Sequence, residues 1–278
     1  MTTGTLRICG TPIGNLGDVT QRLRDTLAGA TVIACEDTRR TRALLTALGI
    51  PAPKLERLDA HTEERGATRL VERLLYGDDV ALVTDAGMPA VSDPGSRLVL
   101  AAAAAGVVVE VIPGPSAVTA AFAASGIEGD GFAFIGFLPR TPGGLNARLD
   151  AADAWGLPLI AFEAPGRLPR TLATLAAREP ERRIVVCREL TKLHEQVARG
   201  TVAELAAQFG EPPPGEVTLV LAAGAPRPAG GPSEVQLHDA LVQLRDSGLG
   251  ARRASEIAAL LSGLPRRELY ERLIDEAP

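Results

Sequence analysis

The stretch LVTDAGMPAVSDPG, residues 82–95, ends an apolar run on Asp85 and then places an Asp-Pro-Gly turn, Asp93 to Gly95, only eight residues later. The apolar run predicts a buried strand, and ligands bind beyond the carboxyl ends of the strands in an open parallel sheet. A carboxylate at that edge is costly without a partner, so we expect Asp85 to serve a function there. The favoured interpretation of SDPG is structural: it predicts a helix start, with Ser92 or Asp93 as the cap and Pro94 at the first helical position.

Short β-like runs alternate with segments of helical period on both sides of this stretch. Five strands separated by four helices predict a parallel sheet covered on both faces, which gives an N-terminal α/β domain over residues 1–114. The expected strands are residues 5–10, 31–36, 54–59, 79–85 and 107–114, and the expected helices are residues 18–30, 38–49, 64–77 and 94–106.

The pattern changes after residue 114. Strands outnumber helices and several seem joined by short connections, which predicts a second α/β domain with a mixed sheet over residues 115–225. A linker rich in proline and glycine, residues 225–233, closes it. The tail, residues 233–278, is predicted to contain three short helices and resembles a helix-turn-helix module. The tail is either an RNA contact or a packing appendage.

Composition limits the class of protein. The 278-residue chain has a net charge of −5, so its overall field does not indicate a nucleic-acid binder, although local arginine clusters still allow phosphate contact. The three cysteines lie in apolar runs without CxxC spacing, so we expect buried thiols and no metal site. No apolar run approaches the roughly 18 residues that span a bilayer, so we expect a cytoplasmic protein with no membrane partner.

Two further strand ends carry loops rich in glycine and proline. GTPIGNLGDVT, residues 10–20, has three glycines that let the backbone approach a ligand, and Asp18 is placed to cap the next helix. Its spacing fits neither the dinucleotide GxGxxG pattern nor a phosphate P-loop. IPGPSAV, residues 112–118, leaves the amides of Ser116 and Ala117 free to bind a ligand carboxylate. We expect all three loops at one edge of the sheet.

Seven motifs, taken in order, resemble those of the ribosomal RNA small subunit methyltransferase I family, within the tetrapyrrole methylase fold: GTPIGNLGDVT, ACEDTRRT, TDAGMPAVSDPG, PGPSAVTA, GFLPR, CRELTK and GEVTLVL. The match covers nearly the whole chain. The resemblance implies S-adenosylmethionine-dependent 2′-O-methylation of a cytidine ribose in 16S rRNA within the 30S subunit. It also implies a two-domain homodimer that holds the cofactor in the cleft between its domains. Met88 and EAPGR, residues 163–167, depart from the commoner family pattern.

The resemblance also assigns candidate site residues. A 2′-hydroxyl is a poor nucleophile at neutral pH, so a group that removes its proton would help. The candidates are Asp37, Glu163 and Lys192 with its neighbour Glu189, and each is alternatively a structural ion pair. Lys192 is a base only if burial lowers its pKa, and otherwise it orients phosphate or ribose. The expected cofactor contacts are Pro12, Ile13, Gly14, Asn15, Asp85, Ala86, Gly87, Met88, Pro89, Ser116 and Ala117, and the expected RNA contacts are Arg39, Arg40, Arg42, Arg252 and Arg253.

Two rival functions stay open at this point. One is C-methylation of a tetrapyrrole of the uroporphyrinogen or precorrin type, which requires a wide cleft for an acidic macrocycle. The other is a non-catalytic module that binds RNA or the ribosome through its helical tail.

Overall fold

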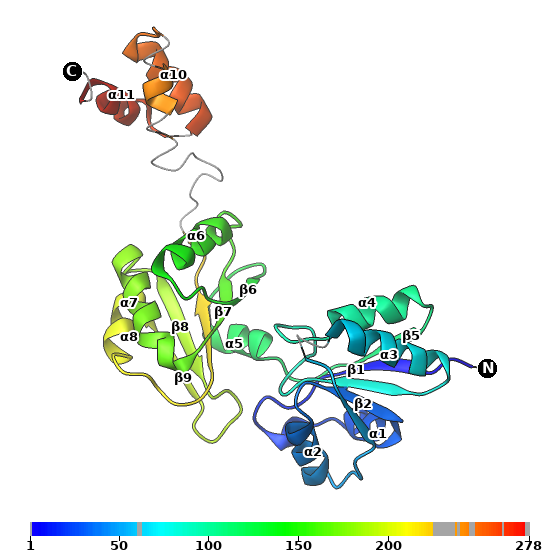
Figure 1. Cartoon of the computed structure of the whole chain (residues 1–278). Coiled ribbons are helices and arrows are strands. Elements are labelled where there is room, and N and C mark those ends of the chain that lie inside the picture. Colours follow the sequence, from blue (N-terminus) through cyan, green and yellow to red (C-terminus); the bar gives the residue numbers. More distant parts are fainter. Residues whose placement is uncertain are drawn as a thin grey trace.

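The computed structural model describes residues 2–59, 63–224, 237, 240–244, 248–262 and 264–275. Two α/β units follow one another along the chain, and the segment 113–116 joins them (Figure 1). We refer to Thr5–Ile112 as the first unit and to Ala117–Leu221 as the second unit. The predicted linker, residues 225–233, lies outside the described residues.

The first unit is a five-stranded parallel sheet with the order β3-β2-β4-β1-β5. The fully buried runs VIAC and VALV form β2 and β4 near its centre, because only a strand covered on both faces can bury every residue. The elements are β1 (Thr5–Cys9), α1 (Gln21–Gly29), β2 (Val32–Cys35), α2 (Thr38–Ala47), β3 (Lys54–Arg57), α3 (Glu63–Leu75), β4 (Val80–Val83), α4 (Ser96–Ala104) and β5 (Val108–Ile112).

Helices cover both faces of this sheet, as the sequence predicted. Leu70 of α3 and Leu98 of α4 pack against one face, and Leu27 of α1 and Leu45 of α2 pack against the other. Figure 1 shows the two pairs of helices on opposite sides of the strands. The parallel sheet and its covering helices are therefore confirmed.

The second unit is a mixed sheet with the order β6-β7-β10-β8-β9. Only β6 and β7 are parallel, and the other neighbours are antiparallel. One face packs against α6, α7 and α8, and the other packs against α5. The elements are α5 (Ala117–Ser125), β6 (Ala133–Phe137), α6 (Pro142–Asp153), β7 (Leu159–Glu163), α7 (Leu168–Arg178), β8 (Arg183–Arg188), β9 (Gln196–Thr201), α8 (Val202–Gln208) and β10 (Val217–Leu221).

The described part of the tail has its own small apolar core. Helices α10 (Ala251–Ser262) and α11 (Arg266–Asp275) contribute Ala254, Ala258, Leu269 and Leu273 to it. Among the described residues, no helix is long and apolar enough to cross a membrane.

The structure corrects the two predicted helix caps. Helix α4 begins at Ser96, not at Pro94, and its N-cap is Gly95 with a φ of 136°. Glu63 Oε1 accepts the amide hydrogens of Gly95 at 2.8 Å and Arg97 at 3.1 Å. The Glu63 carboxylate, from α3, therefore caps α4, a role that the sequence predicted for Ser92 or Asp93.

The second wrong cap is Asp18. This residue ends a short 3-10 turn, Leu16–Asp18, instead of capping α1. Thr20 caps α1 and accepts the amide hydrogen of Leu23 at 3.1 Å. A threonine oxygen two residues closer to the helix reaches its first turn in the geometry that an N-cap requires.

Candidate active site

The three predicted loops meet at the carboxyl edge of the first sheet. Thr11, after β1, and Gly87, after β4, exchange two backbone hydrogen bonds of 2.9 and 3.1 Å. Gly10 and Gly114 approach so closely that a β-carbon built on Gly114 would lie 2.5 Å from the oxygen of Gly10. Only glycine permits this contact. The segment that joins the two units is thus fixed against the first loop.

A cleft of about 450 Å³ opens between the two units at this edge. The first unit contributes the ends of β2 and β4, and the second contributes the start of α5, the end of β7 and the start of β10. Its lining residues are Ile13, Glu36, Arg40, Asp85, Ala86, Gly87, Met88, Val91, Ser92, Asp93, Ser116, Ala117, Val118, Phe137, Phe162, Glu163, Ala164, Pro165, Glu216, Val217 and Thr218. The volume is typical of small-molecule and cofactor sites.

One wall of the cleft is acidic. Asp85 accepts the amide hydrogen of Asp37 at 3.2 Å and lies 3.4 Å from Nε of Arg40. Thr84 donates to Glu36 at 3.2 Å. Burial raises the pKa of Asp93 to about 6, and the charges of Glu36 and Asp85 add to this effect, although a hydrogen bond to Thr84 opposes it. Negative charge on this wall favours a cationic ligand group.

The start of α5 gives the cleft an electropositive surface, in contrast to the acidic wall. Its N-cap, Ser116, makes no side-chain capping bond, and Ser116, Ala117 and Val118 all line the cleft. The first amides of a helix have no partner within the helix, and the helix dipole makes this end positive. Such a helix start favours a carboxylate or another anion, and the binding of a ligand carboxylate by Ser116 and Ala117 stays a prediction.

An aromatic pair completes the cleft. The rings of Phe137 and Phe162 meet edge to face with centroids 5.5 Å apart. Phe137 is 60% exposed although it belongs to a strand. An exposed aromatic side chain beside a cleft offers a surface on which a planar ligand can stack.

The structure places seven of the eleven expected cofactor residues on the cleft: Ile13, Asp85, Ala86, Gly87, Met88, Ser116 and Ala117. Pro12, Gly14, Asn15 and Pro89 do not line it. Asn15 caps the 3-10 turn by accepting the amide hydrogen of Gly17 at 2.8 Å. Gly14 faces Lys192 of the second unit instead of the cleft.

Among the three expected catalytic residues, Glu163 alone lines the cleft. Its carboxylate is fully buried and 3.0 Å from Nε of Arg167, and it accepts hydrogen bonds from Thr171 Oγ1 at 2.6 Å and Ala164 N at 2.7 Å. Arg167, Thr171 and Ala164 thus fix the position of this carboxylate. Its lone pairs are largely occupied, which leaves little capacity to accept a substrate proton.

Asp37 lies outside the cleft lining and is the N-cap of α2. It accepts the amide hydrogen of Arg39 at 2.8 Å and pairs with the Arg39 guanidinium at 2.9 Å. The side chain and backbone of Arg39 lower the pKa of Asp37 to about 2. A carboxylate this acidic is a weak proton acceptor near neutral pH.

Lys192 ties the CRELTK loop to the start of β10. Its Nζ lies 2.8 Å from Glu189 and 3.1 Å from Glu216, which lines the cleft. Burial lowers the pKa of Lys192, but the hydrogen bonds to the two glutamates outweigh it and the net pKa is raised. The condition for Lys192 to act as a base is therefore not met.

Backbone strain is concentrated in the two loops that frame the cleft. Ala90 and Ser92 have φ of 66°, and Glu189 and Thr191 have φ of 52° and 67°. Such conformations persist only where the surroundings enforce them, and they gather at ligand sites. The Glu189 carboxylate supplies this constraint in its loop by accepting hydrogens from Lys192 Nζ and Glu216 N.

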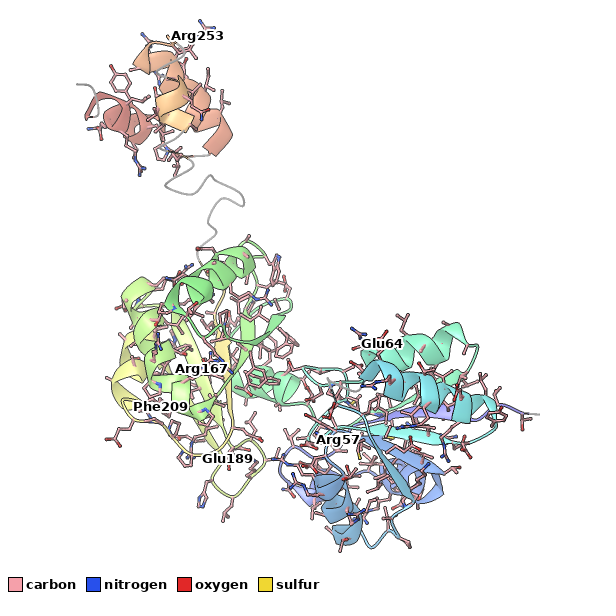
Figure 2. The ribbon with its side chains drawn as sticks, in the orientation of Figure 1. Arg57, Glu64, Arg167, Glu189, Phe209 and Arg253 are labelled. Carbon is pink, nitrogen blue, oxygen red and sulfur yellow. The ribbon has the colours of Figure 1, made fainter. Side chains whose placement is uncertain are left out.

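The expected RNA arginines fall in two places. Arg40 lines the cleft, while Arg39 is bound to Asp37 and Arg42 is exposed on α2. Arg252 and Arg253 are exposed on the first turn of α10, and Figure 2 labels Arg253 there.

The sequence did not predict a cleft position for Glu36, Phe162 or Glu216, and it favoured a capping role for Asp93. Glu36 ends an apolar strand as Asp85 does, so the same signal could have found it. Glu216 precedes β10, which runs antiparallel to β7 and pairs Val217 with Glu163. A search confined to carboxyl ends of parallel strands cannot find such a residue.

Comparison with known proteins decides the family. Residues 5–206 match the family model of tetrapyrrole (corrin/porphyrin) methylases. The chain belongs to the tetrapyrrole methylase family. It is 42% identical over 273 residues to the ribosomal RNA small subunit methyltransferase I of Xylella fastidiosa strain Temecula1, covering 97% of this chain and 98% of the relative. The Synechocystis protein of the same name is 41% identical over 96% of each chain. Within the tetrapyrrole methylases, the chain thus belongs to the ribosomal RNA small subunit methyltransferase I family.

A solved structure agrees in fold. Uroporphyrin-III C-methyl transferase from Thermus thermophilus, complexed with S-adenyl homocysteine, matches with a TM-score of 0.55 at 21% identity, over 78% of this chain and 96% of that chain. The predicted family, fold class and methyltransferase activity are confirmed, and so is S-adenosylmethionine as the family's methyl donor.

Proposed function

We propose that this methyltransferase transfers a methyl group from S-adenosylmethionine to the 2′-oxygen of a cytidine ribose in 16S rRNA, with the 30S subunit as substrate. The observation that carries the proposal is the cleft itself. It combines an acidic wall, the uncapped start of α5 and an aromatic pair, in a chain closely similar to proteins named ribosomal RNA small subunit methyltransferase I.

The cleft residues fit this cofactor. S-adenosylmethionine supplies an electrophilic methyl group on a sulfonium cation. Carboxylates of Glu36, Asp85 and Asp93 suit its positive charges, and the amides at the start of α5 suit its carboxylate. Phe137 offers a stacking surface for the planar part of the molecule. The donor set therefore matches both charged ends and the planar part of the molecule.

Methyl transfer of this kind is an in-line displacement, so the protein mainly aligns the two reacting atoms and excludes water. We assign the proton-accepting role to Asp93, because it lines the cleft and its pKa of about 6 lies near the working pH. Glu163 then fixes the wall of the cleft through Arg167. Lys192, held by Glu189 and Glu216, positions the CRELTK loop, and Asp37 anchors the start of α2.

The rival tetrapyrrole reaction fits the cleft less well. An acidic macrocycle would bring carboxylates toward the wall formed by Glu36, Asp85 and Asp93, and like charges at short range are unfavourable. Arg40 is the one basic side chain among the residues that line the cleft. The charge balance favours a substrate without clustered carboxylates.

The function is tested by incubating the protein with methyl-labelled S-adenosylmethionine and either unmodified 30S subunits, free 16S rRNA or uroporphyrinogen. We expect label in 30S subunits, on a cytidine ribose identified by nuclease digestion and mass spectrometry. Label in uroporphyrinogen alone would establish the rival reaction, and RNA binding without label would establish the non-catalytic module.

The exposed edge of the first sheet is a suitable interface for the predicted homodimer. β5 is an edge strand of the first sheet, with Val108 56% and Val111 51% exposed. Edge strands with exposed apolar side chains are usually covered. We expect a second copy to cover this edge, and light scattering on the purified protein measures the resulting mass.

A further inference from the structure

A second groove lies on the second unit, next to the cleft. Its volume is about 190 Å³, and it is formed by residues 139–145 and 167–174, at the starts of α6 and α7. Three arginines, Arg140, Arg167 and Arg170, contribute to its lining, and no carboxylate does. We call it the arginine groove.

Arg167 is the structural member of this set. Its guanidinium pairs with the buried Glu163 and also donates to the carbonyl oxygens of Leu138 and Pro139. Glu163 therefore neutralises its charge, and the turn that precedes Arg140 is fixed to the start of α7. Figure 2 labels Arg167 in the second unit.

Arg140 and Arg170 are exposed, and in the part of the chain that the structure describes neither has an ion-pair partner. The groove therefore carries two uncompensated positive charges in a concave site. The start of α6, with Thr141 as its N-cap, adds the positive end of a helix dipole. Guanidinium groups bind phosphate oxygens in a bidentate geometry, so an arginine pair in a groove suits a phosphate group.

The arginine groove is coupled to the cleft by shared residues. Glu163 lines the cleft, while its two side-chain donors, Arg167 and Thr171, line the groove. One buried carboxylate thus forms the partition between the two cavities. The groove is therefore separated from the cleft by little more than the Glu163 side chain and its two donors.

We propose that the arginine groove binds a phosphodiester of the single-stranded RNA segment next to the nucleotide in the cleft. This inference rests on the proposed function, because it requires RNA as the substrate. Phosphate contacts fix the register and orientation of a bound strand, so the backbone beside the modified nucleotide needs its own contacts. Arg140 and Arg170 supply contacts that hold the backbone without reading sequence.

The experiment compares the double variant Arg140→Gln/Arg170→Gln with a control of equal charge change, Arg22→Gln/Arg183→Gln, whose residues are exposed and line neither cavity. Binding of 30S subunits assembled from unmodified 16S rRNA is measured over a range of salt concentrations. For the double variant we expect affinity to fall at least about tenfold. We also expect the slope of log affinity against log salt to become shallower by about 0.7, since one phosphate contact on a single strand contributes about 0.7.

Two further measurements separate the outcomes. S-adenosylmethionine affinity, measured by calorimetry, should match wild type in both variants, and KM for 30S subunits should rise in the double variant while kcat is kept. A double variant that binds 30S subunits with the affinity and salt slope of the control overturns the arginine groove, while methylation by the wild-type enzyme still supports the proposed function. A wild-type enzyme that neither binds nor methylates 30S subunits overturns both.

Discussion

Gly14 and Lys192, from opposite units, touch at the edge of the cleft: a β-carbon built on Gly14 would lie 2.4 Å from Cγ of Lys192. The same β-carbon would lie 3.1 Å from the carbonyl oxygen of Leu190. Gly14 thus has a role that its place in a glycine-rich loop did not reveal. Its lack of a side chain lets the CRELTK loop of the second unit pack against the loop after β1, so the two loops form one surface.

Replacing Gly14 by alanine tests this contact. We expect Gly14→Ala to displace the 190–192 loop and to lower the free energy of unfolding by about 1–3 kcal/mol, as overpacking does. Cofactor affinity should fall as well. Gly29→Ala is the matched control, because no atom lies within 4 Å of a β-carbon at that position. Thermal unfolding and calorimetric titration check the effect, and equal behaviour of the two variants would contradict it.

The cap on α4 gives a second prediction. Glu63→Ala removes the acceptor of the Gly95 and Arg97 amide hydrogens, so we expect a loss of about 1 kcal/mol in the free energy of unfolding. Its neighbour Glu64 is 85% exposed and pairs with Arg97 at 3.5 Å, and Glu64→Ala should change stability by no more than about 0.5 kcal/mol. Denaturant titration of both variants distinguishes a cap from a surface ion pair.

Asp93 gives a prediction that depends on pH. Its pKa is raised from 3.8 to about 6, so between these values the folded protein holds a proton that the unfolded chain has lost. The contribution of Asp93 to the free energy of unfolding is therefore full below about pH 4 and is lost as pH rises through 6. Asp93→Asn removes this dependence.

We therefore expect Asp93→Asn to gain stability relative to wild type between pH 4 and 7, in denaturant titrations at several pH values. Methylation by the wild-type enzyme should rise with pH through about 6, and the variant should lose at least about 100-fold in rate. A variant with wild-type turnover would remove Asp93 from the role of base.

Glu163 is expected to be structural. Glu163→Gln leaves the Arg167 guanidinium without its buried counter-charge, and we expect a loss of about 2 kcal/mol in the free energy of unfolding. Turnover at saturating cofactor and 30S subunits, below the melting temperature, should stay within about tenfold of wild type, whereas loss of a base costs about 100-fold or more. Glu181→Gln, at an exposed position, is the control.

The cysteines should be inert in the native protein. Burial raises the pKa of the Cys9 thiol to about 12 and that of Cys187 to about 11, and it also raises the pKa of Cys35. Thiolate is the reactive form, so we expect no alkylation by iodoacetamide at pH 8 until the protein is unfolded. Mass spectrometry of the intact protein counts the modified thiols, and rapid native labelling would contradict this expectation.

The alternation of apolar and helical segments was sufficient to predict both sheets, because burial on two faces leaves a strong local signal in strands such as β2 and β4. The convergence of the loops after β1, β4 and β5 also followed from that pattern. The position of Asp93 on the cleft wall did not follow from it. The sequence around it, Ser-Asp-Pro-Gly, is typical of a helix cap, but the distant Glu63 caps α4 instead. Contacts between residues far apart in the chain carry no local signal.

The same limit explains the rest of the site. Nothing near Lys192 in the sequence indicates that Glu216 completes its contacts, and nothing near Arg140 indicates that Arg167 fixes the turn before it. Both relationships arise from strand pairing and helix packing in the second unit. Spacing along one segment predicts which groups lie at a sheet edge, but not which of them neutralise one another.

The contact between Gly10 and Gly114 fixes the covalent crossing between the two units beside the pocket, whose lining includes Ser116 from the same crossing. The crossing cannot act as a loose tether, since its backbone is locked where the ligand would bind. We therefore expect a change in the angle between the lobes to reshape the pocket, and a molecule that fills the pocket to restrict that angle.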